Sequence, residues 1–108
     1  GPVFIDFHGE ATSEKIAMAR YLDGRITALV GTHTHVQTAD EQILSQGTAF
    51  ISDIGMTGPN DSVIGMEKKL VLERFLSARK NKFVPATEDP WLAAVYLEID
   101  NKKVINYL

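Results

Sequence analysis

Two short apolar runs that end in histidines are the most constraining feature of this sequence. The run 3–7 is followed directly by His8, and the run 26–30 is followed, after two intervening residues, by the pair His33 and His35. Short apolar runs with such boundaries are typical of buried strands. Side chains two apart on an extended chain point to the same side, so we expect both imidazoles of the pair to face one point in space.

The histidines predict a metal site. His8, His33 and His35 are the 3 histidines of the chain, and cysteine is absent, so any ligands would be imidazole, carboxylate, amide or water. We expect the three imidazoles to lie within metal-bridging distance, around one ion or two ions about 3.5–4 Å apart. The alternative, hydrogen-bonded histidines without a ligand role, stays open.

Several oxygen-bearing residues accompany the histidines. Asp6 and Asp53 lie in strands that look buried, where they would either orient a ligand imidazole or accept backbone N–H groups. Glu10 follows the first histidine, and we favour a role in helix entry over one as a ligand. Candidate hydroxyl donors to a phosphate-like oxygen, each with low weight, are Thr32, Thr34, Thr38 and Thr57.

The order of the expected elements indicates an α/β protein. Strands are expected at 3–7, 26–30 and 48–54, a helix at about 13–22 capped by Thr12 or Ser13, and a less regular stretch at 36–47. A turn-rich loop at 55–62, a helix at about 66–79 and a connector at 81–90 follow, and then a hairpin that alternates from Trp91 to Ile99, turns at 100–103 and returns over 104–108. No repeat or second domain is visible, so we expect a single domain, 1–108.

Composition excludes several classes of function. A net charge of −3 and a pI near 5.5 provide no basic surface for a nucleic-acid polymer. No apolar run approaches the roughly 20 residues that span a bilayer, and no secretory-type segment is present. The absence of cysteine suits a cytoplasmic protein.

Three blocks in order, 5–15, 30–41 and 53–59, closely resemble the YmdB-type bacterial metallophosphodiesterases of the calcineurin-like superfamily. The resemblance implies an α/β (α+β) fold, a mixed-sheet β-sandwich flanked by helices, of which this chain looks like the carboxyl-terminal half. It also implies two metal ions, iron or manganese foremost and zinc as a possibility. His8 and His33 would then ligate one ion, and His35 would ligate the other.

The same resemblance implies a metal-dependent phosphodiesterase as the full-length parent. A metal-bridging hydroxide would attack phosphorus in a cyclic nucleotide, notably a 2′,3′-cyclic one, or in another small phosphodiester. The leaving-group histidine and the other metal ligands are expected in the amino-terminal half, so no catalytic residue is assigned here and the substrate-binding residues stay unknown. We expect the chain to form a homo-oligomer or to pair with that missing half.

Two other interpretations compete with this one. An amidohydrolase-type or histidinol-phosphatase-type barrel also places a His-x-His pair after a strand, but it needs about 200 or more residues of repeated strand–helix units, and the terminal hairpin argues against it. A non-catalytic metal-binding, nucleotide-binding or assembly fragment stays open as the alternative function.

Overall fold

The structure is a computed structural model that describes residues 1–101 and 103–107. The chain forms two compact units: Gly1–Gly55 together with Ala94–Leu108 make the first, and Met56–Ala93 make the second. The single domain expected from the sequence therefore stays a prediction.

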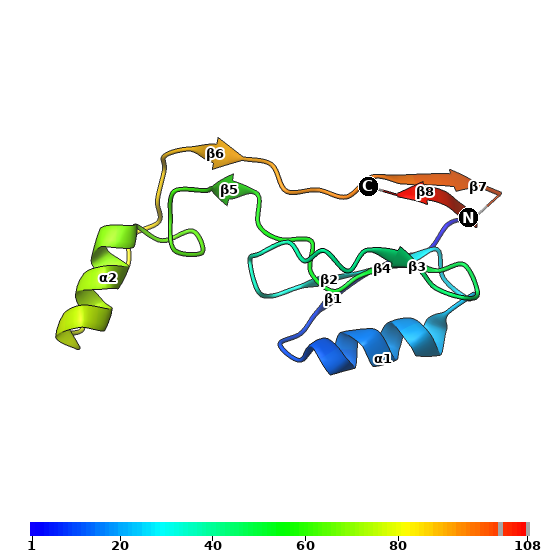
Figure 1. Cartoon of the computed structure of the whole chain (residues 1–108), viewed down its shortest axis with the longest axis horizontal. Coiled ribbons are helices and arrows are strands. Elements are labelled where there is room, and N and C mark those ends of the chain that lie inside the picture. The colour runs from blue at the N-terminus through cyan, green and yellow to red at the C-terminus, as the bar shows by residue number, and fades with distance from the viewer. Residues whose placement is uncertain (102, 108) are drawn as a thin grey trace. The chain divides into compact units, whose positions relative to one another are not determined.

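The first unit is built on a mixed four-stranded sheet in the order β1-β2-β4-β3. Figure 1 shows α1 lying along these strands. Helix α1 connects two parallel strands, and a third parallel strand and a short antiparallel edge strand complete the sheet. This arrangement confirms the predicted mixed α/β class. The elements are β1 (Phe4–His8), α1 (Thr12–Leu22), β2 (Ala28–Thr32), β3 (Gln42–Ile43) and β4 (Ala49–Ile51).

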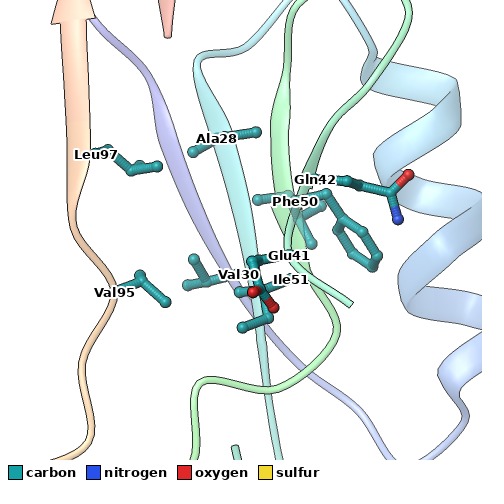
Figure 2. Close-up of a pocket in the computed structure, with 10 residues that line it drawn as sticks. Ala28, Val30, Glu41, Gln42, Phe50, Ile51, Val95 and Leu97 are labelled. Atoms are coloured by element: carbon teal, nitrogen blue, oxygen red, sulfur yellow. The ribbon is translucent and has the colours of Figure 1, made fainter. Parts of the chain in front are cut away.

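Both faces of this sheet bury apolar side chains. On one face, Leu29 and Phe50 pack with Ala19 of α1. The other face meets the antiparallel hairpin of β7 (Leu97–Asp100) and β8 (Lys103–Tyr107), where Ala28 of β2 lies in one cluster with Ala49 and Val104. Figure 2 shows Phe50 directed toward α1, while Val95 and Leu97 approach the sheet from the opposite side. Burial on both faces explains why the central strands are apolar without alternation.

The second unit contains a short antiparallel pair and one helix. These are β5 (Gly58–Pro59), β6 (Pro90–Trp91) and α2 (Lys68–Ser77), which lies within the predicted range 66–79. The expectation that Trp91 begins the terminal hairpin was wrong: Trp91 pairs with Gly58, and the hairpin strand begins only at Leu97. An alternating pattern records which side chains share a face, but it does not identify the partner strand. Of the predicted turn 100–103 and strand 104–108, residues 102 and 108 lie outside the described part.

Two local predictions are also corrected. Ala11 is the N-cap of α1 and makes no side-chain cap hydrogen bond, so neither Thr12 nor Ser13 caps this helix. Packing of the helix on the sheet stabilises it in place of a cap. The third strand ends at Ile51, because the pairing of β4 with β2 stops there. Across residues 1–101 and 103–107, no helix is both long enough and apolar enough to cross a membrane.

Candidate metal centre

The candidate site lies where β1 and β2 end. His8 is the last residue of β1 and stands opposite Thr32, the last residue of β2, in the parallel register. His33 follows immediately in the chain. Parallel strands bring their carboxyl ends to one edge of a sheet, and this is where binding groups of α/β sheets usually lie. The register therefore joins two histidines that are 25 residues apart in the sequence.

His8 and His33 are in direct contact. Nε2 of His8 lies 3.3 Å from Nδ1 of His33, and the two ring centroids are 5.2 Å apart with the rings at 71°. Two imidazole nitrogens that share one ion at about 2.1 Å each lie roughly 3.0–3.4 Å apart, depending on the angle at the metal. The observed separation fits that requirement. Both side chains are exposed, so an ion can reach them.

A second set of contacts supports His8 from the side away from His33. Nδ1 of His8 lies 3.1 Å from the Thr32 hydroxyl, and this hydroxyl donates to Oδ1 of Asp6, also at 3.1 Å. Asp6 is exposed, contrary to the expectation of a buried carboxylate, because on the edge strand β1 it shares the exposed side with Phe4 and His8. Its hydrogen bond links it to the imidazole through one intervening side chain.

The His-x-His segment is a bend and not the extended strand that the sequence predicts. β2 ends at Thr32, and the backbone φ angles of His33 and His35 are 152° and 66°. Positive φ is strained for residues with a Cβ and persists only where surrounding contacts impose it. The shared direction expected for imidazoles two apart on a strand therefore does not apply. Instead, the pairing of β1 with β2 brings His33 to His8.

Asp53 holds this bend in place. One of its carboxylate oxygens accepts the backbone N–H of Thr34 at 2.8 Å, and the other accepts that of Gly55 at 2.8 Å. The side chain is 1% exposed and forms an ion pair with the equally buried Lys15 of α1, with 3.5 Å between Nζ and Oδ2. Of the two roles considered for Asp53, the structure supports the acceptance of backbone N–H groups.

The contacts of Asp53 also set its ionisation. Burial raises the pKa of this carboxyl, but the hydrogen bonds from Thr34 and Gly55 and the positive charge of Lys15 outweigh burial and lower the pKa below 3.8. Sequence analysis missed Lys15. Its signal is the spacing to Ala19, four residues later, since both lie on the buried face of α1.

Among the remaining candidates, three threonines make structural hydrogen bonds and Glu10 is exposed. The hydroxyls of Thr34 and Thr57 donate to backbone carbonyls, and that of Thr38 donates to the carboxylate of Asp40. Glu10 is exposed and lies just before α1, in keeping with helix entry. In the described part of the chain, no three His, Cys, Asp or Glu side chains come together as a metal-binding group. Metal ligation by His8, His33 and His35 stays a prediction.

The similarity of this chain to known proteins extends over nearly its whole length. The model of the family described as "YmdB-like protein" matches residues 2–107. The chain is 51% identical over 100 residues to the 2′,3′-cyclic-nucleotide 2′-phosphodiesterase of Bacillus subtilis, an alignment that covers 93% of this chain and 38% of that protein.

Two solved structures share the fold. A hypothetical protein from Thermus thermophilus is 42% identical with a TM-score of 0.90, over 98% of this chain and 42% of that one. A novel phosphatase from Mycoplasma pneumoniae is 40% identical with a TM-score of 0.87, over 95% of this chain and 38% of that one. This chain therefore spans about two fifths of the length of the proteins it matches.

Proposed function

Because the chain belongs to the YmdB-like family, we propose that it forms part of a metal-dependent phosphodiesterase and contributes His8, His33 and His35 to its metal centre. The name of the Bacillus subtilis relative supports cyclic nucleotides, notably 2′,3′-cyclic ones, as the substrate class. The observation that carries the proposal is the 3.3 Å approach of His8 Nε2 to His33 Nδ1 at the carboxyl edge of the sheet.

The donor set fits transition-metal ions. Imidazole binds iron, manganese and zinc, and we propose iron or manganese foremost. His8 and His33 would hold one ion and His35 the other. Bound ions would supply Lewis acidity toward a phosphoryl oxygen and polarise water. The other ligands and the leaving-group histidine would come from the part of the longer relatives that this chain does not match.

The partner surface that we propose is the outer edge of β1. β1 is the terminal strand of the sheet, so one side of its backbone has no neighbouring strand within the described four-stranded sheet, and Phe4 is 57% exposed. Open strand edges readily accept another strand. We propose that a second copy, or the unmatched part of the longer protein, pairs there, in a cytoplasmic setting.

The first test is substitution of His33, the histidine that contacts His8. We expect His33→Ala to lower hydrolysis of bis-p-nitrophenyl phosphate and 2′,3′-cyclic AMP by at least about a hundredfold, since loss of a ligand removes several kcal/mol of charge stabilisation. Activity and bound metal are measured with added manganese. The chain is assayed alone and mixed with the amino-terminal part of the Bacillus subtilis relative.

Lys69→Ala, an exposed substitution on α2, is the matched control and should keep both activity and metal. Activity that appears only on mixing supports a metal centre shared between two segments. If neither metal nor activity is found in any mixture, the phosphodiesterase proposal fails. The non-catalytic binding or assembly function, with which the contact of two imidazoles is also compatible, would then be favoured.

A further inference from the structure

We propose that Thr32 and Asp6 are positioning residues that hold His8 in one tautomer, with the proton on Nδ1 and the lone pair on Nε2 directed at the metal centre. The role of this tautomer in metal binding rests on the proposed function. The hydrogen bonds that select the tautomer do not depend on it. Three side chains on one face of the sheet form the series Asp6, Thr32 and His8.

The direction of each hydrogen bond follows from chemistry. An ionised carboxylate only accepts, so the single proton of the Thr32 hydroxyl goes to Asp6. That hydroxyl oxygen can then only accept from Nδ1 of His8, at 3.1 Å. A neutral imidazole carries one proton, so Nε2 is left unprotonated. This is the nitrogen that lies 3.3 Å from His33.

The register of the sheet makes the arrangement possible. Asp6 and His8 are two apart on β1, so they share a face, and Thr32 is the residue paired with His8 on β2. The hydrogen bonds among Asp6, Thr32 and His8 do not involve the bend that carries His33 and His35. The assignment also removes Thr32 from the candidate phosphate donors, because its proton is committed to Asp6.

The tautomer of His8 can be read directly by nitrogen-15 NMR of the metal-free protein at pH 8, where an ordinary histidine is neutral. We expect the Nδ1–H form in the wild type. Thr32→Val should shift the ratio toward Nε2–H by about threefold to tenfold, the worth of one hydrogen bond. Thr32→Ser keeps the hydroxyl and should restore the wild-type ratio.

Asp6→Ala provides the second variant. Without its acceptor, the Thr32 hydroxyl is free to donate to Nδ1, so the Nε2–H form should increase although Thr32 is intact. Manganese titration should show affinity lower by about tenfold to a hundredfold in Thr32→Val and near normal in Thr32→Ser.

The inference is overturned if wild-type His8 is in the Nε2–H form, or if neither Thr32→Val nor Asp6→Ala changes the ratio. Because NMR is done without metal, its result does not depend on the phosphodiesterase proposal. A wild-type chain that binds no manganese even when mixed with the amino-terminal part of the Bacillus subtilis relative would count against the proposed function, and the NMR result would still decide the role of Thr32 and Asp6.

Discussion

The side chain of Asp53 connects the bend at residues 33–36, which carries His33 and His35 and is called the histidine bend, to the core of the first unit. It accepts two backbone N–H groups and pairs with Lys15, and both charged side chains are 1% exposed. A buried ion pair adds little compared with an apolar pair, but removal of one partner leaves the other charge buried and uncompensated. The sequence revealed the carboxylate but not its partner, since a lysine in a helix is usually exposed.

We expect Asp53→Asn to lower the free energy of unfolding by about 3–5 kcal/mol, because Lys15 would keep its charge in a buried site without a counter-ion. Urea denaturation measures the change. Asp61→Asn is the matched control: its partner Lys68 is 57% exposed and Asp61 itself is 55% exposed, so the loss should be below about 1 kcal/mol. Equal losses in the two variants would contradict a structural role for the buried pair.

At the scale of elements, Gly31 allows β2 to pass close to the chain that follows β4. A Cβ at Gly31 would collide with the carbonyl oxygen of Ser52 and would lie 2.9 Å from Cδ of Lys15. The carbonyl of Gly31 also accepts the N–H of Ile54 at 2.9 Å. The lack of a side chain at Gly31 thus allows the segment 52–54, which contains Asp53, to pack directly against β2.

Gly31→Ala should therefore destabilise the protein by about 1–3 kcal/mol or more, since the obstructing atoms include backbone. Gly9→Ala is the comparison, because its added methyl would meet only Phe7 at 3.4 Å, and we expect a change within about 0.5 kcal/mol. Thermal unfolding of both variants is the measurement. A Gly31→Ala protein as stable as Gly9→Ala would show that β2 and the chain after β4 separate easily.

The elements that the sequence predicted well are those with a strong local pattern. β1, α1, β2 and α2 were expected within two residues of their observed bounds. β3 and the pairing of Trp91 with Gly58 were not expected, since strands of two residues have no periodicity to detect. In the site, the contact of His8 and His33 depends on strand register, whereas the positive φ angles of the bend depend on tertiary contacts.

At the scale of the whole molecule, three carboxylates of the first unit accept hydrogen bonds from distant backbone. Asp23 accepts the N–H groups of Gln46 and Thr48, and Asp40 accepts that of Ser52. Burial raises the pKa of Asp23, Asp40 and Asp53, but these hydrogen bonds outweigh burial, and each pKa is lowered below 3.8. Groups with a lowered folded pKa stabilise the native state above the unfolded value.

We expect the free energy of unfolding to be steady above about pH 5 and to decrease as the pH falls through 3.8 and below, where the unfolded chain binds protons more readily than the folded one. Urea titrations between pH 6 and pH 2 would reveal the loss. The same titrations in high salt would separate two causes of the loss in stability. The contribution of the hydrogen bonds would persist, whereas that of surface charges would be screened. A stability that is unchanged down to pH 2 would contradict the lowered pKa values.

The anchoring of the histidine bend has a thermodynamic consequence. Asp53 holds the conformation that carries His33 and His35 by accepting the N–H of Thr34, and its ion pair with Lys15 links it to α1 on the sheet. Any ligand that prefers this conformation therefore stabilises the packed core by mass action, in proportion to the logarithm of its concentration. Conversely, substitutions beneath α1, far from the imidazoles, would weaken ligand binding without altering a single ligand-contacting atom.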